Sequence, residues 1–254
     1  MIFELGITTG LTVMLLALLA EYVDSSIGMG YGTTLTPILL LYGFEPLQII
    51  PAVLLSQLVA GIFAGFLHHK FGNVDFRSGK HLKIAIILAL CGIIGTIASV
   101  LIAINISALY LKLYIGFLVI TVGIVILITI NKKYAFSWEK IAGFGLFAAF
   151  NKGLSGGGYG PVVVMGQLLS GSNEKNAIAI TALAEGLTCI VAVIAYSVTG
   201  RAIWVLAPYL LIGSILSVPL STFTVKIIKG KQLRMIIGIA TIILGIFTII
   251  TVLH

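Results

Sequence analysis

The stretch SSIGMGYGTTLTP, residues Ser25–Pro37, interrupts a long apolar run with three glycines, Gly28, Gly30 and Gly32. Glycine inside a helix costs about 1 kcal/mol relative to alanine. In a bilayer, no water is available for the backbone groups that a broken helix exposes. A helix break here therefore needs a specific reason, and that reason depends on whether the chain spans a membrane.

The composition predicts an all-α polytopic membrane protein. The chain is 59% hydrophobic and 9% charged, whereas soluble domains carry about 25% charged residues. A helix needs about 20 apolar residues to cross a bilayer. Tracts of this length recur too often to be one signal peptide. They are Ile84–Ile104, Leu113–Ile130, Ile203–Val225 and Met235–Leu253.

The net charge of +7 comes largely from basic residues in short loops between these tracts. This grouping is typical of cytoplasmic loops of membrane proteins and argues against a nucleic-acid partner. Cys91 and Cys189 lie in apolar tracts and form no metal-ligand pattern, so we expect no metal and no cofactor. The grouped basic residues are Lys70, Arg77, Lys80, Lys83, Lys132, Lys133, Lys140, Lys226, Lys229, Lys231 and Arg234.

The cytoplasmic loops determine the expected path of the chain. Ile141–Val225 begins and ends in the cytoplasm, so it must cross the membrane an even number of times. Lys175–Ser197 and Ile203–Val225 supply two spans. Ile141–Leu169 must then enter and return to the same side, and it contains a second glycine cluster, SGGGYGP, at Ser155–Pro161. The same reasoning places both termini outside the cell.

The two glycine clusters are related by a repeat. Gly30-Tyr31-Gly32 recurs as Gly158-Tyr159-Gly160, an offset of 128 residues that also aligns Gln57 with Glu185 and Asp24 with Lys152. Later, YIGFLVITVGI from Tyr114 resembles IIGIATIILGI from Ile236. We therefore expect two inverted-topology repeats, each a broken, re-entrant-like hairpin followed by three transmembrane helices. The expected parts are residues 1–131, a cytoplasmic linker at 132–140, and residues 141–254.

Such duplications are typical of secondary transporters, whose sites form near the midplane from discontinuous helices. Short helices are expected to restart near Thr33 and at Pro161, and their free amides attract anions. The alternative is that the glycines only permit close helix packing. The candidate substrate-binding residues are Ser25, Ser26, Gly28, Gly30, Tyr31, Gly32, Thr33, Lys152, Ser155, Gly156, Gly157, Gly158, Tyr159 and Gly160.

Ionisable residues within membrane spans are functional candidates by default. Glu185 lies mid-span and is predicted to couple transport to an ion, or else to tie helices together by hydrogen bonds. Asp24 and Lys152 are predicted to form a structural salt bridge or to be site residues. The candidate ion-coupling residues are Asp24, Glu185, Glu21 and Gln57. His68, His69 and His81 fall in a basic loop and are expected to be solvated.

The duplicated glycine-rich hairpin and the segment GGGYGPVVV at Gly156–Val164 resemble the TauE/SafE sulfite exporter family over essentially the whole chain. The resemblance implies a plasma-membrane carrier of sulfite, sulfonates or related sulfur compounds, driven by a proton or Na⁺ gradient. This chain departs from the usual glycine run at Tyr31 and Tyr159, and Met165 stands where the repeat would place a second proline opposite Pro37. Sulfite, sulfoacetate, thiosulfate and a carboxylate all remain open as substrates.

Two other function classes share features with this sequence. GLSG at Gly153–Gly156 matches the GxSG motif of rhomboid-type intramembrane proteases, whose serine needs a nearby base. His68, His69, His81 and His254 lie outside the expected spans, so we predict that the chain is not an enzyme. A passive anion channel is the closer alternative, because the same helix ends would line a pore. The expected partners are a small anion, a coupling ion and the lipid bilayer, with a homodimer left open.

Overall fold

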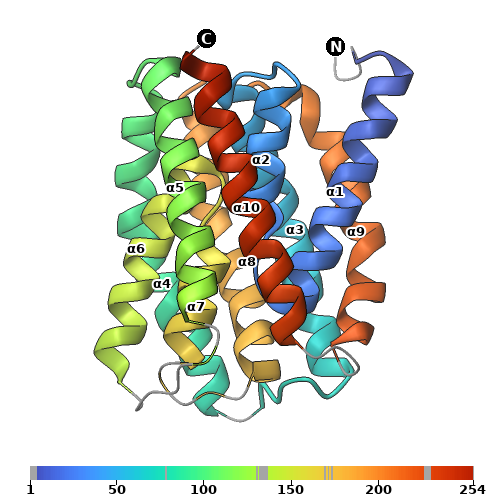
Figure 1. Ribbon diagram of the computed structural model, residues 1–254. Coiled ribbons are helices and arrows are strands. Elements are labelled where there is room, and N and C mark those ends of the chain that lie inside the picture. Colours follow the sequence, from blue (N-terminus) through green and yellow to red (C-terminus); the bar gives the residue numbers. More distant parts are fainter. Residues whose placement is uncertain are drawn as a thin grey trace.

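The computed structural model describes residues 5–77, 79–129, 131, 137–168, 170, 172, 174–225 and 230–253, and all regular structure in this part is helical (Figure 1). Residues 132–136 of the predicted linker, with Lys226, Lys229 and His254, lie outside the described residues. The helices are α1 (Ile7–Ile27), α2 (Tyr31–Leu41), α3 (Pro46–Lys70), α4 (Gly79–Ala103), α5 (Ala108–Ile128), α6 (Trp138–Ser155), α7 (Tyr159–Leu168), α8 (Glu174–Val198), η1 (Trp204–Leu206), α9 (Ala207–Thr224) and α10 (Gly230–Leu253).

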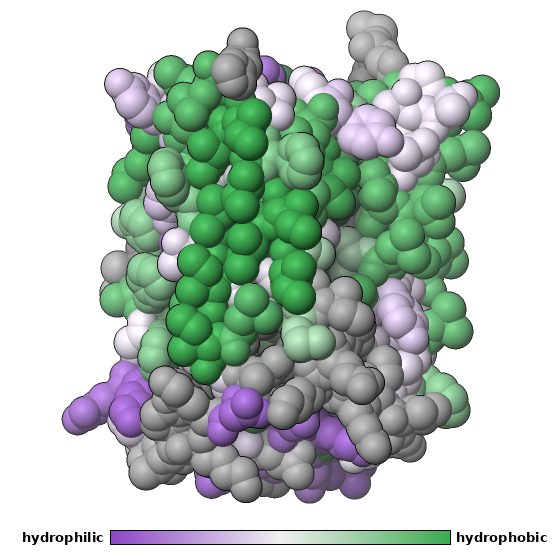
Figure 2. Space-filling model, in the orientation of Figure 1, coloured by the Kyte–Doolittle hydropathy of each residue, from purple (hydrophilic) through white to green (hydrophobic). Residues whose placement is uncertain are grey.

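The length and composition of the helices confirm the prediction of an all-α polytopic membrane protein. Six helical segments are long and apolar enough to cross a bilayer, and two shorter apolar helices accompany them at Tyr31–Leu41 and Gly238–Leu253. Figure 2 shows apolar side chains over the middle of the visible face and hydrophilic ones gathered at its lower end. The six segments are Ile7–Ile27, Pro46–Lys70, Gly79–Ala103, Ala108–Val125, Glu174–Val198 and Trp204–Thr224.

Both glycine clusters break a helix, and they do so in the same way. α1 is capped by Gly28 with φ 73°, and α6 is capped by Gly156 with φ 75°. This left-handed conformation ends a helix with little strain only when the residue is glycine. α2 and α7 then begin at Tyr31 and Tyr159, two residues earlier than predicted. Pro161 is tolerated within the first turn of α7 because the first amides of a helix have no partner within it.

The helices form two layers. Helices α1, α9, α3, α8, α4 and α6 pack side by side in that order, while α5 pairs with α10, and α2 and α7 contact both groups. The packing of α1 on α9 and of α3 on α9 recurs as α6 on α4 and α8 on α4. The start of α1 and the end of α10 lie at the same end of the bundle (Figure 1). An inverted duplication would produce these arrangements, and the duplication itself stays a prediction.

The contact between α5 and α10 explains why their sequences resemble each other. A Cβ built on Gly123 would lie 2.8 Å from the carbonyl oxygen of Gly238, and one on Gly245 would lie 3.0 Å from that of Gly116. All four glycines of the two similar segments therefore lie at the contact, but crosswise, Gly123 against Gly238 and Gly116 against Gly245. Small residues at this contact let the two backbones approach closely.

Candidate functional site

The two helix breaks lie against each other, backbone to backbone. A Cβ on Gly32 would overlap the carbonyl oxygen of Gly156, and one on Gly160 would lie 2.5 Å from that of Gly28. Under the offset of 128 residues each contact is the counterpart of the other. The main-chain nitrogen of Gly158 also donates to Thr33 Oγ1 at 3.2 Å. Close packing, the alternative considered from sequence, is therefore one role of these glycines.

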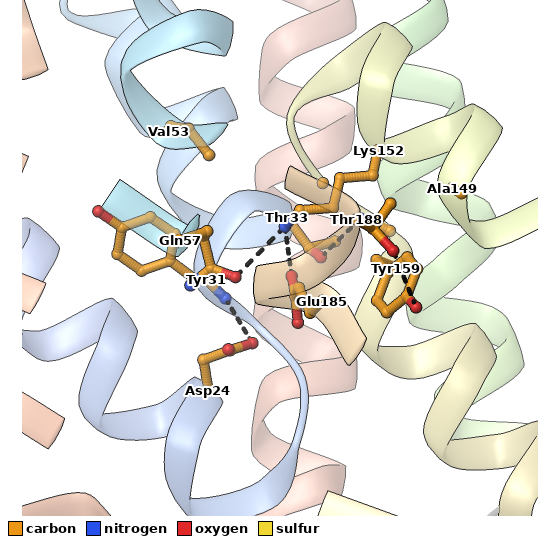
Figure 3. Close-up of polar contacts among 12 residues, drawn as sticks. Asp24, Tyr31, Thr33, Val53, Gln57, Ala149, Lys152, Tyr159, Glu185 and Thr188 are labelled. Atoms are coloured by element: carbon orange, nitrogen blue, oxygen red, sulfur yellow. Dashed lines mark hydrogen bonds and ion pairs between the residues drawn. The ribbon is translucent and has the colours of Figure 1, made fainter. Parts of the chain in front are cut away.

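A buried network of polar side chains lies beside the breaks. Lys152, in the last turn of α6, forms an ion pair with Glu185 of α8 and donates to Gln57 Oε1 of α3 at 3.2 Å (Figure 3). Gln57 Nε2 donates to Glu21 Oε2 at 2.7 Å, and Ser25 Oγ donates to Glu21 Oε1 at 2.5 Å. All five side chains are buried, and the residue Lys152 is only 1% exposed. The network thus links four helices of the same layer, α1, α3, α6 and α8.

Of the two alternatives for Asp24 and Lys152, a structural salt bridge between them is wrong. An Asp24 carboxylate oxygen instead accepts a hydrogen bond of 3.2 Å from the main-chain nitrogen of Tyr31. This amide has no partner within α2, and the positive end of the helix dipole favours a carboxylate there. Lys152 instead contacts Gln57 and Glu185, the two residues that the offset of 128 residues aligns.

Because Asp24 bonds to the amide of Tyr31 and Lys152 pairs with Glu185, the starts of α2 and α7 differ chemically. Asp24 places a carboxylate at the start of α2. Its counterpart before α7 is Lys152, whose ammonium has donors only and cannot accept a hydrogen bond from the amide of Tyr159. The start of α7 therefore lacks the carboxylate that caps α2, and a buried cation precedes it in the chain.

The two tyrosines of the breaks anchor the helix starts. The Tyr31 hydroxyl hydrogen-bonds to Ser56 Oγ of α3 at 2.8 Å, and Thr188 Oγ1 of α8 donates to the Tyr159 hydroxyl at 3.5 Å. Both rings are fully buried. Substrate contact by these tyrosines stays a prediction. Sequence reasoning missed Ser56 and Thr188, although each is a polar residue in the middle of an apolar span, which is the signal that would have found them.

The remaining candidate hydroxyls bond to main chain. Ser155 Oγ donates to the carbonyl oxygen of Asn151 at 2.8 Å and accepts from the nitrogen of Gly157 at 3.2 Å. Ser26 Oγ donates to the carbonyl oxygen of Ser221 at 3.4 Å. In the described part of the chain no histidine hydrogen-bonds to Ser155, as the serine protease alternative would require.

The expectation that all three loop histidines are solvated is wrong for His68. This residue is 0% exposed, whereas His69 and His81 are partly exposed. The reason is that α3 continues to Lys70, so His68 lies in the last turn of a helix and not in a loop. The last turn of α3 is covered by the following loop and by α9, where Asn73 Nδ2 donates to a main-chain oxygen.

Together these features define the class of protein: a polytopic α-helical membrane protein with an ion pair buried beside two apposed helix breaks. The sequence profile described as Sulfite exporter TauE/SafE matches residues 13–248, so the chain belongs to this family of membrane transporters. A "Probable membrane transporter protein YtnM" of Bacillus subtilis (strain 168) is 31% identical over 156 residues, which is 58% of this chain and 50% of the relative. The match thus spans about half the length of that curated relative. No solved structure matches the chain.

Proposed function

We propose that this protein is a secondary active transporter of a small sulfur-containing oxyanion, sulfite, a sulfonate or a similar compound, in the plasma membrane. Transport proceeds by alternating access at the two apposed helix breaks and is coupled to a proton or Na⁺ gradient. The observation that carries the proposal is the buried cation Lys152 in the last turn of α6, which precedes the start of α7 in the chain. Irregular backbone at membrane depth is tolerated where it lines a site or is buried in protein.

The difference between the two helix starts supports an anion site at α7. At the start of α2, the free amide of Tyr31 binds a negatively charged group, the carboxylate of Asp24. At the start of α7, the equivalent side chain is the cation Lys152. An oxyanion that binds there takes the position that Asp24 takes in the first half. It also replaces Glu185 as the partner of the ammonium group.

The charge balance of the network supports coupling to a cation. Glu21, Asp24 and Glu185 are buried carboxyl groups, and Lys152 is the buried cation that they surround. With every group ionised, three negative charges face one positive charge before any substrate binds. Uncompensated buried charge is costly, so an anionic substrate requires protons or a metal cation to enter the site with it. Protonation of Glu185 would free Lys152 to bind the anion.

A flux experiment tests the function. The purified protein is reconstituted in liposomes, and uptake of radiolabelled sulfite is measured with an inward pH gradient, with a Na⁺ gradient and with neither. A carrier accumulates sulfite above the outside concentration only when the coupling gradient is present. Sulfite that equilibrates at the same rate in all three conditions would support the channel alternative. If sulfite is not taken up, thiosulfate and sulfoacetate are the next probes.

Replacing Glu185 with glutamine is expected to uncouple transport. Glu185→Gln keeps the shape of the side chain but leaves Lys152 without its anionic partner. We expect sulfite exchange to persist at a rate near that of wild type and gradient-driven accumulation to fall to background. Glu174→Gln, an exposed acid on the same helix, is the matched control and should accumulate sulfite normally. Full accumulation by Glu185→Gln would assign coupling to Glu21 or Asp24 instead.

The distribution of basic residues supports the proposed orientation, with both termini outside. Among the described residues, the loops after α3 and before α6 and α8 carry basic residues, at the end of the bundle where hydrophilic side chains gather (Figures 1 and 2). Lys112 lies in the first turns of α5 and Arg201 follows α8, at the other ends of the helices that enter these loops. Asn105→Cys in an outer loop is expected to react with an impermeant maleimide added to intact cells, and Asp75→Cys in a basic loop is not. The reverse labelling pattern would invert the topology. The basic residues at the cytoplasmic end are Lys70, Arg77, Lys80, Lys83, Lys140 and Lys175.

A further inference from the structure

One face of α9 carries three fully buried serines, Ser214, Ser217 and Ser221. The hydroxyls of Ser214 and Ser221 donate to main-chain oxygens of their own helix. The hydroxyl of Ser217, by contrast, has no hydrogen-bond partner in the described part of the chain. Buried polar groups nearly always have a partner. The Ser217 oxygen therefore indicates a position for a bound water or ion.

Helices α1 and α9 pack side by side and run in the same direction (Figure 1). A Cβ built on Gly213 of α9 would lie 2.9 Å from the Cβ of Ala17 in α1. The residue four positions later in a helix lies on the same face, one turn further along. In α9 this residue is Ser217, and in α1 it is the buried Glu21. The unpartnered hydroxyl therefore lies at the level of the Glu21 carboxylate, on the surface of α9 that faces α1.

Neighbouring hydroxyl groups supply further oxygen atoms. The Tyr31 hydroxyl interacts with the side chains of Ser214 and Glu21 and hydrogen-bonds to Ser56 Oγ at 2.8 Å. Ser25 Oγ donates its hydrogen to Glu21 Oε1 at 2.5 Å, and a hydroxyl that donates keeps its lone pairs for a second partner. Helices α1, α2, α3 and α9 thus bring one carboxylate and several hydroxyls together.

These groups have the chemistry of a site for a hard cation, because hard cations bind oxygen ligands. Asp24, the next acid along α1, is held by the amide of Tyr31, so Glu21 is the carboxylate that remains for a cation at this level. Uncompensated buried charge is costly, and a single carboxylate balances a cation of charge one. The site therefore suits Na⁺ better than a divalent metal.

We propose that Glu21, Ser25 and Ser217 bind the Na⁺ ion that drives transport, at a site separate from the anion site beside Lys152. The assignment rests on the proposed function and names its coupling ion. The two sites lie at opposite ends of the Gln57 amide, whose Nε2 donates to Glu21 and whose Oε1 accepts from Lys152. One amide thus joins the cation site to the anion site.

Na⁺ at Glu21 changes which atom of the Gln57 amide faces this carboxylate. A cation repels the amide hydrogens and attracts the amide oxygen, so the side chain turns and presents Oε1 to Na⁺. Lys152 then loses Oε1 as an acceptor, and the anion replaces it. In Glu185→Gln the ammonium lacks its anionic partner even without Na⁺, which agrees with the uncoupling expected for that variant.

Thermal unfolding tests the cation site without any transported anion. The purified protein in detergent is unfolded in sodium, potassium and choline chloride at equal ionic strength. Wild type should unfold at a higher temperature in sodium, because a ligand that binds the folded state stabilises it. Ser217→Ala should need about tenfold more Na⁺ for the same shift, the effect of losing one contact to a charged group. Glu21→Gln should show no shift.

Ser221→Ala is the matched control for this experiment, because it removes a hydroxyl from the same face of α9 whose partners lie in its own helix. It should respond to Na⁺ as wild type does. Equal shifts in sodium and potassium, or an unchanged Na⁺ response in Ser217→Ala, would overturn the site. Should Glu21→Gln not fold, the titration of Ser217→Ala with Na⁺ decides alone.

Sulfite uptake in liposomes separates this site from the proposed function. With an inward Na⁺ gradient, Ser217→Ala should raise the Na⁺ concentration for half-maximal uptake about tenfold and keep the wild-type KM for sulfite at saturating Na⁺. Uptake driven by a pH gradient alone would overturn the Na⁺ site and leave the transporter standing. Absence of sulfite uptake under every gradient, together with the Na⁺ shift in unfolding, would refute sulfite as substrate and leave the Na⁺ site standing.

Discussion

Lys152→Met is expected to abolish transport and destabilise the protein, whereas the double variant Lys152→Met/Glu185→Gln should regain stability without transport. Lys152 is 1% exposed and is the ion-pair partner of Glu185. Removing one partner of a buried pair leaves an uncompensated charge and costs about 3–5 kcal/mol. Replacing both partners leaves no buried charge from the pair. Lys152 has two proposed roles, stabilising the fold through its ion pair and binding the substrate anion. The double variant separates them because it keeps the fold but lacks the cation that we expect to bind the anion.

Thermal unfolding in detergent and sulfite uptake in liposomes check this prediction. Lys112→Met is the matched control, because Lys112 pairs with Glu45 at 3.1 Å but both side chains are partly exposed. Exposed pairs contribute only about 0–1 kcal/mol, so this variant should unfold near the wild-type temperature and transport normally. Uptake by the double variant at the wild-type rate would show that Lys152 is a structural residue alone.

The helix breaks were predictable from sequence because their signals are local. Gly28 and Gly156 adopt the left-handed conformation that ends a helix, and glycine is the residue that favours it. The apolar tracts have the length that a bilayer requires. The recurrence of Gly-Tyr-Gly also located the equivalent turns. These features depend on neighbours in the chain, and the structure contains helices close to where the sequence placed them.

The partners within the site were not predictable in the same way. The offset aligns Asp24 with Lys152 and Gln57 with Glu185, but alignment does not determine which side chains are in contact. The choice depends on the free amide of Tyr31, which takes the carboxylate of Asp24. The burial of His68 likewise depends on the loop after α3, through Asn73, and on α9, which is distant in sequence.

Among the described glycines, Gly32→Ala is expected to be the most damaging alanine substitution. Its Cβ would overlap the carbonyl oxygen of Gly156 and approach Gly157 Cα to 2.8 Å. Both are backbone atoms, so no side-chain rotation relieves the clash, and α2 must move away from the turn between α6 and α7. We expect a large loss of thermal stability together with complete loss of sulfite uptake.

Two further alanine variants turn this expectation into a ranking. At Gly30 the nearest atom to a new Cβ is 3.3 Å away, but φ is +137°, so the cost is backbone strain of about 1–3 kcal/mol. At Gly143 on α6 nothing lies within 4 Å, and alanine should stabilise the helix by up to about 1 kcal/mol. The unfolding temperatures should therefore fall in the order Gly143→Ala, Gly30→Ala, Gly32→Ala. If Gly32→Ala unfolds at the wild-type temperature, the two breaks do not pack backbone to backbone in the membrane. The anion site proposed beside them would then lose its structural basis.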